Sequence, residues 1–202
     1  MLSSALVNWI NSLSQLKTVP FLYQNTKMYI TSTLLTLGLA LIATTSPIVR
    51  PRDLASIEAA ITTIETAVNA LDAAEVAYTS GDPTAIQSAS DAVVSATNAG
   101  TATADASADL SETDALSLVS PIQALTTDVQ NAVNEIIAKQ TEIEAAGYGA
   151  ATLADLIAQN TSATELANAI TVKTPAALQS IAATLAAGIT DAIQEGITAY
   201  SS

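Results

Sequence analysis

Residues 53–78 read DLASIEAAITTIETAVNALDAAEVAY, and this stretch decides the fold. Its large apolar residues recur at spacings mostly of three and four, which places them on one stripe of an α-helix. They are Leu54, Ile57, Ile61, Ile64, Val68, Leu71 and Tyr78. Asp53 is a favourable N-cap, and Ser80-Gly81-Asp82-Pro83 predicts the end of this helix and the start of the next. The stretch therefore predicts an amphipathic helix that buries one face.

The same periodicity continues toward the C-terminus. A second helix is expected from Pro83, with a thin apolar stripe. Ser111-Glu112-Thr113-Asp114 resembles a capping box and opens a long stripe that runs to Ile143. Pro121 lies inside that stripe, so the helix must kink or restart there. Gly147-Tyr148-Gly149 predicts the end of this element.

Two more helices are expected after this turn. One covers about 152–173, with a possible break at Asn160-Thr161-Ser162 and a second cap at Ser162-Ala163-Thr164-Glu165. The last starts at Thr174-Pro175, a cap followed by proline in the first turn, and continues to Tyr200. No β-hairpin signal is present in the sequence. The fold class predicted is all-α, an antiparallel bundle of four to five amphipathic helices.

The core of this bundle must be built from small and aliphatic side chains. The only Trp and the only Phe, Trp9 and Phe21, precede Asp53, and the only aromatic residues after it are Tyr78, Tyr148 and Tyr200. Alanines allow close helix approach but bury little area each. A bundle of this composition can therefore leave an apolar void in its centre.

Charge divides the chain near Asp53. All nineteen acidic residues lie from Asp53 onward, and only two of the six basic residues do, so residues 53–202 carry a formal charge of −17. This charge argues against binding nucleic acid or anionic lipid headgroups. It favours a soluble monomer. Residues 53–202 are predicted to form one helical-bundle domain.

The segment before Asp53 has the pattern of an export signal. Lys27 precedes an apolar run, 28–43, which is too short to span a membrane but long enough for a signal peptide. Residues 28–52 are interpreted as a signal peptide with a short pro-segment, and residues 1–27 as an upstream extension. The expected product is extracellular, secreted or held in the cell wall, and without a transmembrane anchor in its mature form.

Catalysis and metal binding have little support in this composition. The chain contains no cysteine and no histidine, which removes thiol chemistry, the usual general base and the commonest metal ligand. The acidic cluster around Asp105 lacks the glycine and glutamate of a calcium-binding loop, because Leu110 and Leu116 occupy those places. We expect a non-enzymatic protein without a metal or cofactor. Asn160-Thr161-Ser162 is an N-glycosylation sequon, so Asn160 is the predicted glycan site.

The region 53–202 resembles the fungal hydrophobic surface binding protein A family, also called cell wall galactomannoproteins. The matching features are a basic residue before Asp53-Leu54, the helix from Ser111 to Gly147 with Ala138-Lys139-Gln140 before Ile143, the Lys173-Thr174-Pro175 turn, and the closing helix to Ala199-Tyr200. The resemblance implies a secreted or wall-associated helical glycoprotein that binds apolar surfaces, some members holding fatty acids in the bundle.

The residues predicted to line an apolar interior are those of the stripes. They are Ile57, Ile61, Ile64, Val68, Leu125, Val129, Val133, Ile181, Leu185 and Ile189. The partner is then a fatty acid or another apolar ligand held in a closed bundle, or a hydrophobic solid on which the bundle opens. No cationic residue is evident for a ligand carboxylate, which could accept a hydrogen bond from Tyr78, Tyr148, Tyr200 or a backbone amide, or could remain in water. The alternative function is that of a structural cell wall mannoprotein without a lipid ligand.

Overall fold

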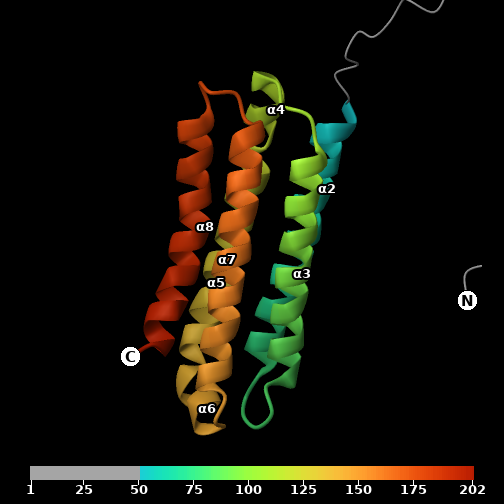
Figure 1. Cartoon of the computed structure of the whole chain (residues 1–202). Helices are drawn as coiled ribbons and strands as arrows, with labels where there is room; N and C mark the ends of the chain where they lie inside the picture. Colours follow the sequence, from blue (N-terminus) through green and yellow to red (C-terminus); the bar gives the residue numbers. More distant parts are fainter. Residues whose placement is uncertain (1–50) are drawn as a thin grey trace, which may run out of the picture. The chain divides into compact units, whose positions relative to one another are not determined.

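The computed structural model describes residues 51–202, with side chains from Asp53 onward, and all its regular structure is helical. The described range contains five long helices and two short ones, whose arrangement is shown in Figure 1. The long helices are α2 (Pro51–Ala77), α3 (Thr84–Ala106), α5 (Val119–Ala138), α7 (Gly149–Lys173) and α8 (Gln179–Tyr200). The short ones are α4 (Glu112–Ser117) and α6 (Gln140–Ala145), which lie at opposite ends of the bundle. The all-α bundle is confirmed.

Most of the N-terminal predictions fall outside these residues. The upstream extension 1–27 and nearly all of the signal peptide and pro-segment 28–52 are not among the described residues. The first described helix, α2, begins at Pro51, two residues before the predicted N-cap. Asp53 therefore lies in the first turn, where its carboxylate still interacts favourably with the positive end of the helix dipole.

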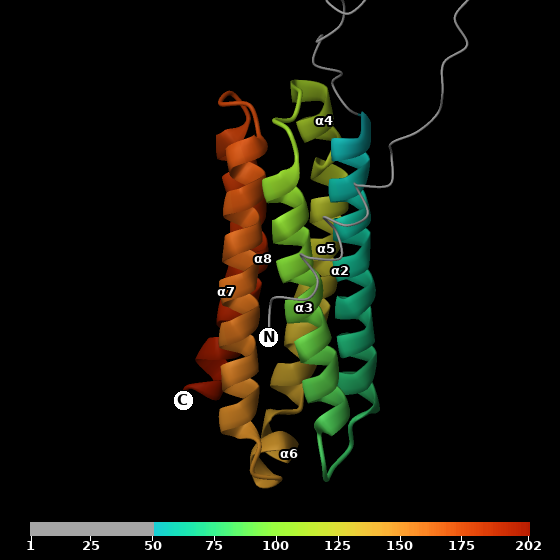
Figure 2. The same cartoon turned by 45° about the vertical axis from the view of Figure 1, so that its right-hand side comes forward.

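The long helices are arranged as a closed ring. Helix α2 packs against α3 and α5, α7 packs against α3 and α8, and α8 packs against α5. The order around the ring is therefore α2, α3, α7, α8, α5, which Figure 2 allows the reader to follow. With axes of neighbouring helices about 9 Å apart, five axes lie about 8 Å from the centre, against about 6 Å for four. A five-helix ring thus encloses more central space than a four-helix bundle.

Chain order and spatial order differ within this ring. Consecutive long helices run in opposite directions between the α4 end and the α6 end, as predicted (Figure 1). The ring, however, places α3 beside α7, α8 beside α5, and α5 beside α2, and the helices of each such pair run in the same direction. Only the pairs α2–α3 and α7–α8 are both consecutive in the chain and adjacent in the ring.

Helix ends follow the turn residues of the sequence. The Ser111 hydroxyl accepts a hydrogen bond from the backbone N–H of Asp114 at 3.1 Å, which confirms the predicted cap of α4. Helix α4 ends at Ser117 and α5 starts at Val119, so Pro121 lies in the first turn of a new helix, where it costs no hydrogen bond. Gly81 and Gly147 adopt φ values of 91° and 85°, which favour glycine.

Two predicted features of the C-terminal half were wrong. Helix α7 continues without a break through 160–162, because Ser162 is buried and its hydroxyl donates to the carbonyl of Gln159 within the helix. Helix α8 begins at Gln179 rather than at Thr174. The Thr174 hydroxyl donates to the carbonyl of Ile170 at 2.9 Å, so it extends the end of α7 and does not cap α8.

The core is continuous along the ring and consists almost wholly of aliphatic residues. Every long helix contributes buried side chains, and Ile57, Leu118 and Ile143 are the largest that are fully enclosed. Close approach of α8 depends on Gly196, because a Cβ atom there would lie 3.2 Å from Leu156 on α7 and 3.4 Å from Val133 on α5. The absence of a side chain at Gly196 thus lets α8 pack closely against both α7 and α5.

The short helix α6 is expected to be a structural element of the core. Ile143 has no exposed surface, whereas Val172 on α7 is 73% exposed. We expect Ile143→Ala to lower the free energy of unfolding by about 2–5 kcal/mol, because it leaves a cavity, and Val172→Ala to change it by less than about 0.5 kcal/mol. Chemical denaturation monitored by circular dichroism measures both; equal effects would contradict the assignment of Ile143 to the core.

Candidate functional site

An elongated cavity lies at the centre of the ring. The space in it that is open to water-sized molecules is about 90 Å³, and all five long helices line it. Its lining residues on α2 run from Ile61 to Glu75, a distance of about 21 Å at 1.5 Å per residue. The lining is predominantly aliphatic, as expected for a site that holds apolar molecules.

The sequence-predicted lining residues divide into three groups. Those that line the central cavity are Ile61, Ile64, Val68, Leu125, Val129, Val133 and Ile189. Ile57 is only 2% exposed and belongs to the core, but it does not line the cavity. Ile181 and Leu185 line a second, smaller cavity between α4, α5, α7 and α8. For all ten predicted lining residues, contact with a bound lipid stays a prediction.

Small side chains are the local reason for the cavity. Ala132, Ala163, Ala167, Ala182 and Ala186 face it from α5, α7 and α8. An alanine leaves empty the volume that a leucine or phenylalanine would fill, and the wide ring leaves no neighbour close enough to compensate. Apolar cavities of this kind stay dry and accept apolar guests.

The first half of α8 is the least enclosed part of the ring. Between Gln179 and Thr190 this helix has no buried residue, and Ile181 is 46% exposed. The second half, in contrast, contributes Ala192, Ile193 and Tyr200 to the core. Both cavities reach the first half of α8 through Ala182. The α4 end of the bundle is therefore the more loosely packed end.

A few polar side chains interrupt the apolar lining. Gln159 on α7 donates from Nε2 to the Ser90 hydroxyl on α3 at 2.7 Å, and both residues are buried. The Thr97 hydroxyl donates to the carbonyl of Val93 in its own helix at 2.8 Å. These groups are satisfied within the protein, so they cost little to bury.

Glu75 is the exception among these polar groups. It is 2% exposed, lines the cavity, and its Oε2 atom is buried without a hydrogen-bond partner. Burial, followed by the negative charges of Asp72 and Glu135, raises the pKa of Glu75 from 4.5 to about 9. Desolvation penalises the ionised form, so this carboxyl is uncharged at neutral pH.

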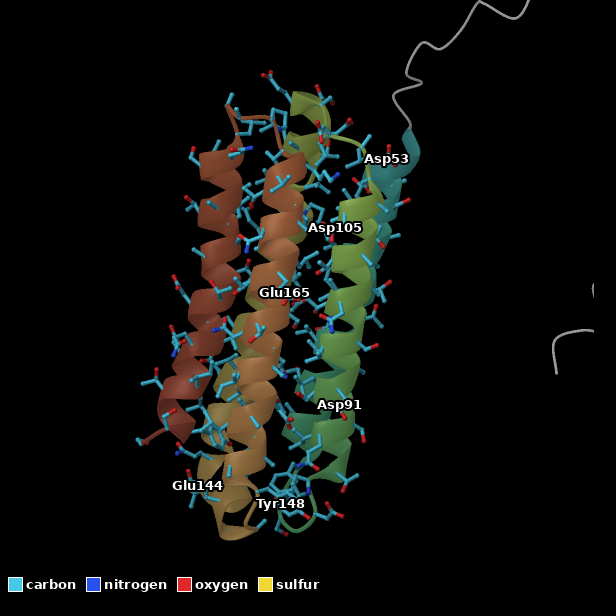
Figure 3. All side chains as sticks on the ribbon, in the orientation of Figure 1. Asp53, Asp91, Asp105, Glu144, Tyr148 and Glu165 are labelled. Atoms are coloured by element: carbon cyan, nitrogen blue, oxygen red, sulfur yellow. The ribbon has the colours of Figure 1, made fainter. Side chains whose placement is uncertain are left out.

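A second carboxyl of the lining lies on α7. Burial and, to a smaller extent, the charge of Asp91 on α3 raise the pKa of Asp155. Other acidic residues, among them Asp105, Glu144 and Glu165, are exposed on the outside of the bundle (Figure 3). The acidic composition therefore has two parts, a charged exterior and a small number of carboxyls facing the cavity.

The two buried tyrosines do not offer free donors to the cavity. The Tyr78 hydroxyl donates to the carbonyl of Gly81 at 3.0 Å, and the Tyr200 hydroxyl donates to the carbonyl of Ile136 at 2.8 Å. Burial, followed by nearby acidic groups with Glu144 the foremost, raises the pKa of Tyr200. Each hydroxyl has one proton, so neither is available for a ligand carboxylate without breaking an existing bond.

Asn160, the predicted glycan site, lies in the middle of α7. The residue is half-buried, and its Oδ1 atom is buried without a hydrogen-bond partner. The sequon thus lies on a continuous helix, without the possible break that the sequence suggested there. Glycosylation of Asn160 stays a prediction.

Glu75 is the residue that sequence reasoning missed, although the signal was present. The apolar stripe of α2 passes through Val68 and Leu71 and continues to Tyr78, with a step of seven between the last two. Position 75 completes the three-and-four spacing, so it belongs to the buried face of α2. Because the stripe was identified from apolar residues alone, the prediction did not include Glu75.

Within residues 51–202, no group of three or more acidic side chains is placed to hold a metal ion. No helix in this range combines the length and apolarity that a membrane span needs. What the described part of the chain does present is a ring of helices around an elongated apolar cavity. This combination defines a class of small helical-bundle proteins built around an internal binding space.

The family is established by comparison. The family model for hydrophobic surface binding protein A matches residues 54–171, and the chain belongs to this family. Cell wall mannoprotein 1 of Aspergillus flavus is 43% identical over 169 residues, which are 84% of this chain and 62% of that protein. Its counterpart in Aspergillus fumigatus is 43% identical over 120 residues, which are 59% of this chain and 42% of that protein. The chain thus spans less than two thirds of the length of these relatives.

Solved structures show the same fold. Ligand binding domain 1 of the Penicillium marneffei MP1 protein, complexed with arachidonic acids, matches with a TM-score of 0.72 and 30% identity over 74% of this chain and 99% of that domain. Afmp4p in complex with palmitic acid matches with a TM-score of 0.69 and 25% identity over 73% of this chain and 99% of that chain.

The buried carboxyl makes stability depend on pH. A carboxyl with a raised folded-state pKa stabilises the fold fully below pH 4.5, and this contribution is lost as pH rises toward 9. Between pH 4.5 and 7 the loss is on the order of 3 kcal/mol. Glu75→Gln removes this titration, so we expect the variant to gain stability relative to the wild type as pH rises from 5 to 8.

Urea denaturation at several pH values measures this difference. Glu165→Gln is the matched control, because it removes the same charge from an exposed position of α7. The control should keep the pH dependence of the wild type. Parallel stability curves for Glu75→Gln and the wild type would contradict a buried, uncharged Glu75.

Proposed function

We propose that this chain is an extracellular, non-enzymatic protein that binds a long-chain fatty acid inside its helical ring. The observation that carries the proposal is the central cavity, which all five long helices line with mainly aliphatic side chains. Its span of about 21 Å is close to the length of an extended sixteen-carbon chain with carbon–carbon bonds of about 1.5 Å. The arachidonic and palmitic acids in the related structures support this ligand class.

The energetics favour an apolar chain of this length. Each buried methylene contributes about 0.8 kcal/mol, so a sixteen-carbon chain offers on the order of 12 kcal/mol before ordering and association costs. The cavity open to water-sized molecules gives this chain a place to enter between the helices. The loosely packed first half of α8 is where a widening of the ring would disturb the fewest core contacts.

A second mode of binding rests on the surface of the same end. Leu116 on α4, Val172 on α7 and Ile181 on α8 are exposed at the α4 end. Leu116 and Ile181 also line the smaller cavity. Such apolar side chains give the protein a place to adsorb to a hydrophobic solid, in keeping with the description of its family. Localisation in or near the cell wall is part of the same proposal and is supported by the names of the relatives. The alternative, a structural cell wall mannoprotein without a lipid ligand, predicts an interior that takes up no fatty acid.

The most direct experiment is native mass spectrometry of the secreted protein before and after extraction with organic solvent. A ligand held inside the ring is expected to add a discrete mass that extraction removes and palmitic acid restores. Saturable adsorption to a hydrophobic polymer, with loss of the packed fold, would favour the opening mode instead. A protein that neither carries nor takes up fatty acid would contradict the proposal.

Filling the cavity tests which residues line the ligand site. Ala186 faces the cavity from α8, whereas Ala183 is exposed on the same helix. Both changes to leucine nearly preserve helix propensity. We expect Ala186→Leu to weaken palmitic acid binding by about tenfold or more, because the added methyl groups occupy ligand space, and Ala183→Leu to leave it unchanged. Fluorescent fatty-acid displacement measures both, and equal affinities would argue against a ligand in the ring.

The predicted glycan has its own test. In a secreting eukaryotic host, Asn160 is expected to carry an N-glycan, so that Asn160→Gln and Ser162→Ala each reduce the intact mass by the same glycan. Ser162→Thr preserves the sequon and should preserve the mass increment. An intact mass equal to that of the unmodified polypeptide in the wild type would contradict this prediction.

A further inference from the structure

The cavity contains one polar group that the protein itself leaves unsatisfied. Glu75 is the lining residue of α2 nearest the α6 end, and it is 2% exposed. No hydrogen bond reaches its Oε2 atom, although a buried polar atom without a partner is costly. Elsewhere in the lining, the Gln159–Ser90 pair is satisfied internally. A buried carboxyl oxygen without a partner, in a lining that is mainly apolar, points to a partner from outside the chain.

The side chains around Glu75 show which kind of partner fits. Asp72 on the same helix and Glu135 on α5 both disfavour a negative charge there. On α8, the Tyr200 hydroxyl is engaged by the carbonyl of Ile136, and after α2 the Tyr78 hydroxyl is engaged by Gly81. Across the cavity, Asp155 on α7 also lines the space, and the charge of the exposed Asp91 on α3 acts on it. This end of the cavity therefore disfavours an anion and favours an uncharged head group.

We propose that Glu75 is the residue that binds the ligand's head group, as an uncharged carboxylic acid that exchanges two hydrogen bonds with the protonated carboxyl of a fatty acid. Glu75 donates one O–H to the ligand carbonyl, and the ligand donates its O–H to the second oxygen of Glu75. This pair satisfies the atom that the protein leaves without a partner. The proposal rests on the function proposed above and adds the head-group site to it.

The geometry also sets the orientation of the ligand. With the head group at Glu75, near the α6 end, the acyl chain runs along the lining of α2 toward Ile61 and the loosely packed α4 end. The lining residues between these positions span about 21 Å, enough for about sixteen carbons. A shorter acid would still reach Glu75 but would leave the far part of the cavity unfilled.

Proton balance follows from this arrangement. In water a fatty acid has a pKa near that of an ordinary carboxyl, about 4.3, so it is ionised at neutral pH. The bound ligand is protonated, and the pKa of Glu75, about 9, keeps that side chain protonated below pH 8. At a pH between the pKa of the free acid and the pKa of Glu75, each binding event therefore takes up one proton from solution. Affinity for the acid therefore falls as pH rises, while affinity for an uncharged alcohol does not.

The test compares decanoic acid with 1-decanol on the full chain by isothermal titration calorimetry at pH 5 and pH 8. For the wild type we expect the affinity for the acid to fall by about tenfold or more between the two conditions, and that for the alcohol to change by less than about twofold. This comparison needs no variant. A pH-independent affinity for the acid would show that the head group binds in its ionised form and would overturn the proposal.

Three variants locate the effect at Glu75. At pH 5, Glu75→Leu should weaken binding of the acid by about tenfold, because both hydrogen bonds are lost. Glu75→Gln should stay within about threefold of the wild type, since an amide also donates one bond and accepts one. Glu165→Gln, on the exposed face of α7, should match the wild type for both ligands. Circular dichroism confirms that each variant is folded.

The outcomes separate this proposal from the function on which it rests. If the wild type binds neither ligand, the fatty-acid function fails. If it binds both, but Glu75→Leu retains the wild-type affinity for the acid at pH 5, only the head-group site is wrong. The satisfied Gln159–Ser90 pair would then be the place to look for the head group.

Discussion

The structure depends on the packing of five amphipathic helices into a closed ring. Each long helix must bury an apolar stripe, and in a ring those stripes all face the same central space. With no Trp or Phe after Asp53, the side chains are too short to meet across a ring about 8 Å in radius. The cavity is thus a consequence of two constraints together, the number of helices and the size of the side chains.

The same constraint is consistent with the proposal that an acidic protein with so few basic residues binds fatty acids. In the proposed complex, binding energy comes from burial of the acyl chain in space that side chains leave empty, and not from pairing charges. A cation in the cavity would cost desolvation energy in the empty protein, whereas an uncharged carboxyl costs much less. In this proposal the charged exterior contributes solubility, and the uncharged interior carboxyl binds the polar end of the ligand.

The sequence predicted the helices and much of the lining because both follow from local periodicity. The stripe on α2 and the cap at Ser111 could be predicted because each depends only on residues a few positions away in the sequence. The predicted start of α8 and the predicted break in α7 were wrong for a related reason. The hydroxyls of Thr174 and Ser162 could each cap a following helix or bond within α7, and both donate to carbonyls of α7. The identity of the turn residues alone does not show which of the two partners is used.

By itself, the sequence determined the helical class, the acidic surface and the aliphatic core, since composition and spacing fix them without reference to the rest of the chain. Only the tertiary structure decided the order of helices in the ring, the placing of Ile57 in the core and of Ile61 in the cavity lining, and the burial of Glu75. These depend on contacts between α2 and α5, which are far apart in the sequence. The pKa of Glu75 follows from those contacts, because it is burial first and then the charges of Asp72 and Glu135 that raise it.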